Sequence, residues 1–388
     1  MPVNKLKHSV MWAKHRLRSI WPQDTVILNS AKSNGKNVLL SYITRPFIVR
    51  ENDPSFYSHT NTWECLQIAK IWLNHGFNVD VIDWDNSSFI PRKDYHVFID
   101  IHSNMERLAP LLKEDCLKIL HITGAHWRFQ NAAELKRIED LYIRRGIRLQ
   151  PRRQVPPSNG IECADCATIL GNKFTKDTFA FAGKPLFSIP LSTTIQFPYH
   201  KRDFHNIRNS FLWFGSSGMV HKGLDLVLDA FSQLPSCKLT ICGPVKNEPD
   251  FEAAYYKELY RTPNIKTLGF IDIRSEKFQE IIQKTSALIY PSCSEGQAGS
   301  VVTCLHAGLI PIISYESGVD IDDFGILLKN NSVDEIIEIV KDFSKKDGTI
   351  LEQMSRDAWN YARTNHTREK FSECYNNFVT KILMRKLD

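Results

Sequence analysis

The sequence predicts an α/β protein of two domains, each built on a parallel β-sheet with helices on its faces. The chain has 388 residues, which is enough for two domains of ordinary size. Short apolar segments alternate with amphipathic helices in both halves, and this order is typical of parallel sheets. A polar, irregular stretch at 192–209 separates the halves. We therefore place the hinge between the domains there.

The composition indicates a globular protein with a substantial core, because 43% of the residues are hydrophobic and 24% are charged. The net charge of +6 is mild and no aromatic and basic RNA motif is present, so we expect no nucleic-acid partner. Nine cysteines form no framework, and we interpret Cys163-x-x-Cys166 as buried thiols rather than a metal or redox site. Reduced thiols predict a cytoplasmic protein. No apolar run is long enough to span a bilayer.

Residues 1–33 form a basic N-terminal extension in which lysine and arginine alternate with apolar residues and tryptophan. Two interpretations stay open. The extension rests on an anionic membrane surface, which makes the protein peripheral on the inner membrane face. Alternatively, it packs on the first domain or stays disordered.

The first domain is predicted at 34–195. Loop 44–61 is long, which is typical of a functional loop, and a helix with an apolar stripe follows it. Another helix is expected at about 131–145. Arg152 and Arg153 then lie among turn signals, either to contact an anion or as solvated surface arginines. The strands are expected at 37–42, 78–84, 95–101, 117–122, 165–170 and 187–191.

The second domain is predicted at 196–366. A glycine-containing loop at 215–223 precedes its first helix. Two amphipathic helices are expected near its end, and a last helix at about 368–384. The strands are expected at 211–214, 238–242, 265–270, 287–291, 310–314 and 321–328.

The most informative stretch is 287–313, which reads as strand, acidic loop, helix and strand. The loop presents Glu295, and Gly296 permits a tight turn. A helix is expected from Gln297 to about Ala307. This order places one carboxylate and the free N–H groups of a helix N-terminus at the carboxyl edge of a parallel sheet. Ligands bind at that edge, and helix N-termini favour phosphate.

Lys222 is the strongest partner for Glu295. It follows a glycine-containing strand-to-helix loop whose backbone N–H groups can hold a diphosphate. A fixed cation there stabilises a leaving group that gains negative charge. The plainer alternatives are a surface lysine for Lys222, and an exposed or helix-capping glutamate for Glu295.

Together these segments resemble the donor-site signature of the GT-B glycosyltransferases, specifically the retaining family 4, also called glycosyl transferases group 1. The residues that match are Pro291, Ser292, Glu295, Gly296, Ala307, Gly308 and Pro311, with Lys222-Gly223 in the earlier loop. The resemblance implies a GT-B fold, in which two Rossmann-like domains face an interdomain cleft. It also implies that a C-terminal helix at 367–388 crosses back from the donor domain to the acceptor domain.

The resemblance implies a retaining glycosyltransferase that moves a hexose from a nucleotide diphosphate sugar to a saccharide or lipid-linked acceptor, with no metal or cofactor. It implies catalytic roles for Glu295 and Lys222, and for a cleft histidine, His126 or His121. The donor-binding residues that it implies are Gly215, Ser216, Ser217, Gly218, His221, Gly296, Gln297, Ala298, Gly299, Ser300 and Thr303.

The chain departs from the family pattern at two places. Thr303 stands where the family has a second glutamate, and Ser216 and Ser217 stand where it has an arginine. His221, if protonated, could partly replace that arginine charge. Two alternatives therefore stay open: a catalytically silent GT-B protein that binds a nucleotide or glycan, and a sugar-nucleotide epimerase.

Overall fold

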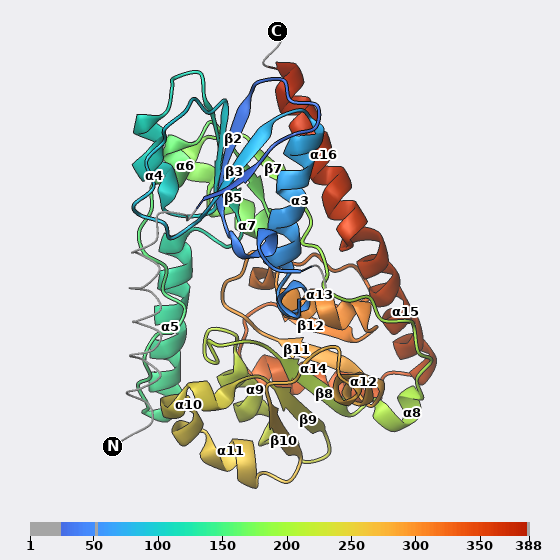
Figure 1. Ribbon diagram of the computed structural model, residues 1–388. Coiled ribbons are helices and arrows are strands. Elements are labelled where there is room, and N and C mark those ends of the chain that lie inside the picture. Colours follow the sequence, from blue (N-terminus) through green and yellow to red (C-terminus); the bar gives the residue numbers. More distant parts are fainter. Residues whose placement is uncertain (1–24, 51–52, 386–388) are drawn as a thin grey trace, which may run out of the picture.

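The computed structural model describes residues 25–50 and 53–385, and it contains two β-sheets (Figure 1). The first has seven strands in the order β1-β3-β2-β4-β5-β6-β7, and the second has six in the order β10-β9-β8-β11-β12-β13. All pairings are parallel except the one between β1 and β3. The predicted α/β fold with two parallel-stranded sheets is confirmed.

The strands of the first sheet carry apolar side chains on both faces, as expected for a sheet covered on both sides. The edge strand β1 was not predicted, because its residues fall within the expected extension 1–33. Residues 1–24, on which the predicted membrane contact depends, lie outside the described residues. The strands are β1 (Thr25–Leu28), β2 (Asn37–Tyr42), β3 (Asn78–Asp83), β4 (Val97–Asp100), β5 (Leu117–Ile122), β6 (Cys166–Ile169) and β7 (Leu186–Ser188).

Two long helices of the first domain begin at histidine caps. His59 and His126 each accept a hydrogen bond from the backbone N–H two residues later, so α3 and α5 start at these points. The cap explains why α5 begins four residues before the predicted start at 131. The helices are α2 (Ser55–Ser58), α3 (Thr60–Asn74), α4 (Asn104–Leu108), α5 (Trp127–Arg145), α6 (Gly160–Cys163) and α7 (Lys173–Asp177).

The second sheet has the doubly wound order, which reverses between its adjacent strands β8 and β11. Ligands of such sheets bind outside the carboxyl ends of the strands at this reversal. The loops after β8 and β11 are the two segments that the sequence singled out. The strands are β8 (Ser210–Phe214), β9 (Lys238–Cys242), β10 (Ile265–Gly269), β11 (Ala287–Tyr290), β12 (Ile310–Ser314) and β13 (Ile326–Leu328).

The helices of the second domain bury apolar stripes against this sheet. Fully buried side chains such as Trp213, Phe231 and Phe343 form the centre of that core. The helices are α8 (Phe204–Ile207), α9 (Leu224–Phe231), α10 (Pro249–Ala254), α11 (Tyr256–Arg261), α12 (Glu276–Gln283), α13 (Gly299–His306), α14 (Val333–Lys345) and α15 (Gly348–Asn365).

The last helix, α16 (Arg368–Arg385), returns from the second domain to the first, as Figure 1 shows in red. It packs on α3, where the rings of Phe371 and Trp63 lie 5.8 Å apart. Asn376 Oδ1 lies 3.0 Å from His75 Nε2 on the same helix pair. The crossing helix expected from the resemblance is confirmed.

Helix α5 joins the domains on the opposite side of the molecule (Figure 1). Arg144 forms ion pairs with Asp225 and Asp229 of the second domain, and Arg145 lies 2.7 Å from Glu258. Asp225 is fully buried, so this contact is part of the interior and not a solvated surface pair. The two domains are thus held together at both sides.

Across residues 25–50 and 53–385, no helix combines the length and the apolar character needed to cross a membrane.

Candidate active site

Lys222 and Glu295 form an ion pair at the carboxyl edge of the second sheet. Lys222 Nζ lies 2.6 Å from Glu295 Oε1, and both side chains are largely buried. Gly223 makes this approach possible, because a Cβ at that position would lie 2.4 Å from the carbonyl oxygen of Pro291. Its φ of +71° is also one that glycine adopts without strain. The structure therefore brings together the two residues that the sequence named first.

Tyr290 and Ser292 complete the contacts of this pair. Lys222 Nζ donates to the Tyr290 hydroxyl at 3.0 Å, and that hydroxyl donates to Glu295 Oε1 at 2.9 Å. Ser292 Oγ donates to the same carboxylate oxygen at 3.1 Å. Sequence analysis assigned no role to Tyr290, since the last residue of a buried strand gives no signal that its hydroxyl reaches a site.

Within the described residues, these contacts leave two groups of the pair uncommitted. Glu295 Oε1 accepts all three hydrogen bonds, and Oε2 has no partner in residues 25–50 and 53–385. The Lys222 ammonium has three N–H donors and makes two contacts there. One N–H and one carboxylate oxygen are therefore available to a ligand.

The pKa of the Glu295 carboxyl is lowered by its neighbours. Burial on its own raises the pKa, but the Lys222 charge and hydrogen bond outweigh burial, and the pKa falls from 4.5 to about 2. Glu295 is therefore ionised throughout the neutral range. Because the folded-state pKa is depressed, the ionised group stabilises the fold above pH 4.5, and this contribution is lost as the pH falls toward 2.

His221 does not replace a missing arginine charge. Its ring is buried, and Nε2 donates to the carbonyl oxygen of Ser294 at 2.6 Å. Burial lowers the pKa of His221 to about 4, so the ring is uncharged at neutral pH. The expectation of a cation here is corrected: His221 holds the 291–296 loop against the 215–223 loop.

The glycine loop offers fewer free amides than the sequence suggested. The Gly215 N–H donates to the carbonyl oxygen of Cys242 at 3.0 Å. The Gly218 and Met219 N–H groups both donate to the buried carboxylate of Glu248. This corrects the expectation that the Gly218 amide binds phosphate, because Glu248 already occupies it. Sequence analysis did not identify Glu248, which lies 30 residues farther along the chain.

Ser216 and Ser217, between these two glycines, are exposed. Their hydroxyls can contact a ligand but bring no positive charge.

The loop before α13 contacts the first domain, whereas the first residue of the helix is exposed. A Cβ on Gly296 would lie 2.3 Å from the Thr123 carbonyl oxygen, and Gln297 Oε1 accepts from the Leu191 N–H at 2.6 Å. The Ala298 N–H donates to the carbonyl oxygen of Ser317 at 2.9 Å. These three residues, which were expected to bind the donor, instead fix the loop against its surroundings.

The helix itself begins two residues later than predicted, at Gly299. Gly299 is exposed and Ser300 is half-buried. Thr303 lies one turn farther along the same helix and is 9% exposed. These three residues stay candidates for ligand contact.

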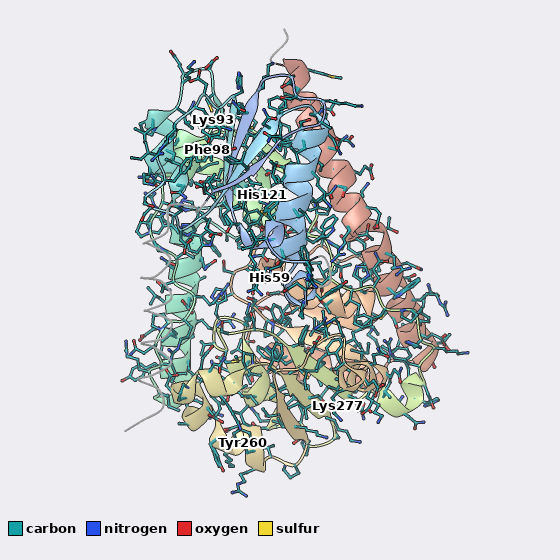
Figure 2. All side chains as sticks on the ribbon, viewed as in Figure 1. His59, Lys93, Phe98, His121, Tyr260 and Lys277 are labelled. Atoms are coloured by element: carbon teal, nitrogen blue, oxygen red, sulfur yellow. The ribbon has the colours of Figure 1, made fainter. Side chains whose placement is uncertain are left out.

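The two predicted cleft histidines have structural contacts. His121 is fully buried, its Nδ1 lies 2.7 Å from Thr168 Oγ1, and its ring packs on Tyr42 and Tyr375. It lies inside the first domain (Figure 2), so the expectation that it faces the cleft is wrong. His126 caps α5 and packs on three aromatic rings, and no contact joins it to Lys222 or Glu295 within the described residues.

Of the two histidines that Figure 2 labels, His59 is the one that lies where the two domains meet. Its side chain is exposed, and Nδ1 accepts from the Asn61 N–H at 3.2 Å. The neighbouring protein partly desolvates the ring, which is the largest effect that lowers the pKa of His59. The positive charges of Arg153 and Lys222 lower this pKa further. The sequence identified it only as part of a helix cap, because its distance from Lys222 depends on how the domains pack.

Among the residues that the structure describes, no group of three or more His, Cys, Asp or Glu side chains is placed to hold a metal ion. Cys163 is half-buried and Cys166 is buried, and both carry free thiols.

Comparisons with known proteins bear on the second domain and on the fold. Residues 208–345 match the family model described as Glycosyl transferases group 1. This segment contains both Lys222 and Glu295. No curated protein sequence matches the chain.

Solved structures match over nearly the whole chain. Sucrose-phosphate synthase from Thermosynechococcus elongatus is 13% identical with a TM-score of 0.62, covering 90% of this chain and 100% of that one. Anabaena HepE, in complex with UDP and glucose, is 12% identical with a TM-score of 0.54, covering 90% and 99%. WaaG, a glycosyltransferase involved in lipopolysaccharide biosynthesis, is 15% identical with a TM-score of 0.52, covering 88% and 98%.

The fold is GT-B. The chain also matches part of the structure of TarM, at a TM-score of 0.49. In that match it spans 54% of the length of TarM. The GT-B fold places the Lys222–Glu295 pair on the side of the second domain that faces the first.

Proposed function

We propose that this GT-B protein is a retaining glycosyltransferase of family 4, which moves a hexose from a nucleotide diphosphate sugar to a saccharide or lipid-linked acceptor. One observation carries the proposal: the Lys222–Glu295 pair, 2.6 Å apart, lies where the strand order of the second sheet reverses. The match of residues 208–345 to Glycosyl transferases group 1 supports it, because the pair lies within that segment.

The chemistry follows from the charges of this pair. When a sugar leaves a nucleoside diphosphate, negative charge grows on the phosphate and positive charge grows on the sugar ring. The Lys222 N–H that has no described partner is a donor for the leaving phosphate. Glu295 Oε2 can accept a hydrogen bond from a sugar hydroxyl, or its negative charge can stabilise the positive sugar ring. Both groups are held in place before the reaction, which is the condition for large electrostatic stabilisation.

A thermal-shift screen with nucleoside diphosphates and their sugars tests this function. A true donor at a hundredfold excess over its dissociation constant should add about 2.7 kcal/mol to the free energy of unfolding. A turnover assay with the donor that is found then separates three outcomes, which are transfer to an acceptor, no turnover, and an isomerised sugar. Isomerisation or the absence of turnover would contradict a transferase. Because a lysine takes the phosphate charge in this proposal, turnover should persist in a metal chelator.

Thr303→Ala should weaken donor binding more than it slows turnover. In the proposed site, Thr303 offers one hydroxyl to the donor nucleotide from α13, where its side chain is 9% exposed. The loss of one hydrogen bond corresponds to a loss of affinity of about 2- to 10-fold. Steady-state kinetics should therefore show a raised KM with kcat nearly unchanged. Thr364→Ala on the exposed face of α15 is the matched control, and equal effects of both changes would exclude the role of Thr303.

A further inference from the structure

Arg153 belongs to the first domain but its side chain lies against the glycine loop of the second. A Cβ placed on Gly218 would lie 2.6 Å from Arg153 Cγ and 3.0 Å from Arg153 Cδ. The arginine stem therefore occupies the space that a side chain at position 218 would fill. Position 218 therefore favours glycine for two reasons. Its φ of +94° is one that other residues rarely adopt, and a Cβ there would clash with the Arg153 side chain.

The Arg153 guanidinium lacks an anionic partner within the described residues, unlike the arginines around it. Arg144 and Arg145 pair with acidic residues of the second domain, and Arg152 lies 2.6 Å from Asp250. Arg153 forms no ion pair or side-chain hydrogen bond in residues 25–50 and 53–385, and its Nε is buried without a partner. An unpaired buried donor of this kind costs free energy unless a ligand satisfies it.

The backbone of Arg153 is nevertheless held firmly. Its N–H donates to both carboxylate oxygens of the buried Glu134, at 2.8 and 3.1 Å. Its carbonyl oxygen accepts from Gln130 Nε2 at 2.6 Å. Both partners project from α5, which the ion pairs of Arg144 and Arg145 fix to the second domain. The arginine is thus positioned by α5 and its side chain alone is free to respond to a ligand.

Arg153 also acts on the Lys222–Glu295 pair. Burial raises the pKa of the Glu295 carboxyl, and nearby groups lower it. The positive charge of Arg153 is one of these groups, with a smaller effect than Lys222 or His221. It likewise lowers the pKa of His59. Arg153 and Lys222 therefore bring two cations to the Glu295 carboxylate, one from each domain. The Arg153 guanidinium has no anionic partner within the described residues, and a guanidinium suits the paired oxygens of phosphate groups.

We propose that Arg153 is a binding residue for the diphosphate of the donor, which it contacts from the first domain while Lys222 contacts it from the second. The inference rests on the proposed function, since it assumes that the ligand at this site is a nucleoside diphosphate. The diphosphate then links the two domains, because each contributes one of its cations. Binding of the diphosphate therefore also stabilises the contact between the domains.

The test is isothermal titration calorimetry of the full chain with UDP, GDP, ADP and inorganic pyrophosphate. For each probe that binds the unchanged protein, Arg153→Gln should reduce affinity by about 10- to 100-fold, because it removes hydrogen bonds from a charged donor. Arg153→Lys should recover part of that loss. The monophosphate of the same nucleoside should lose less affinity than the diphosphate. Arg152→Gln, one residue away and paired with Asp250, is the matched control and should bind as the unchanged protein does.

The other possible results of the titrations would contradict the role of Arg153, and one of them would also contradict the proposed function. If none of the four probes binds the unchanged protein, this proposal and the proposed function both fall. If a diphosphate binds equally well to Arg153→Gln, the role of Arg153 falls and the proposed function stands. Equal losses in Arg152→Gln, or equal losses for monophosphate and diphosphate, would also overturn it. The thermal midpoint of Arg153→Gln without ligand should be no lower than that of the unchanged protein, which shows that the fold is intact.

Discussion

Lys222→Ala should lower turnover with the true donor and acceptor by on the order of a hundredfold or more, which is the scale seen when one preorganised charge stabiliser is removed. The alanine removes the ammonium that faces the leaving phosphate, and no other lysine contacts Glu295 within the described residues. Steady-state kinetics on the purified variant measures the effect. The loss should appear mainly in kcat, because the negative charge on the phosphate grows as the sugar leaves.

Stability must be measured beside activity, because Lys222→Ala leaves the Glu295 carboxylate buried without its partner. Breaking a buried pair in this way costs about 3–5 kcal/mol of folding free energy. The double variant Lys222→Ala with Glu295→Gln removes both charges and should recover much of this stability but none of the turnover. Lys277→Ala, on the exposed face of α12, is the matched control and should have normal activity. Near-normal transfer by a folded Lys222→Ala enzyme would contradict the mechanism.

The sequence was sufficient for most of the fold because the core strands are short, apolar and bounded by polar turns. β2, β5, β9 and β12 have the predicted bounds. β1 was missed because its short apolar run, Val26 to Leu28, was assigned to the N-terminal extension 1–33. Helix ends shifted where a side chain formed a cap, as His126 does for α5. Such caps depend on the local backbone path, which periodicity does not contain.

The site was predictable where its residues are close in sequence to a strand end, and not elsewhere. Glu295 and Lys222 each follow a strand, and the parallel order of β8 and β11 places their loops side by side. Arg153 reaches the same loop from the first domain, and Glu248 reaches it from a later segment of the second domain. These contacts depend on tertiary packing, which strand ends in the sequence do not indicate. His121 shows the converse error. A polar residue at a strand end suggests a ligand contact, but here the histidine lies inside the core with its Nδ1 hydrogen-bonded to Thr168.

Glu295→Gln should cut turnover by on the order of a hundredfold while changing nucleoside diphosphate affinity far less. The glutamine keeps the size of the side chain and can still accept hydrogen bonds from Tyr290 and Ser292, but it cannot stabilise the positive charge on the sugar ring. Kinetics and calorimetry on the same preparation separate the two effects. Glu280→Gln, the exposed partner of Lys277, is the matched control and should change neither.

The pH dependence of stability gives this variant a second, independent measurement. In the unchanged protein the Glu295 carboxyl has a pKa of about 2, so its stabilising charge is complete above pH 4.5 and is lost between pH 4.5 and 2. Glutamine has no such titration, and the variant should therefore lose less stability than the unchanged protein over that interval. Denaturant unfolding at pH 7 and pH 3 measures the difference. The ion pair would be excluded if both proteins lost the same stability, and its role in catalysis would be excluded if Glu295→Gln transferred sugar at a near-normal rate.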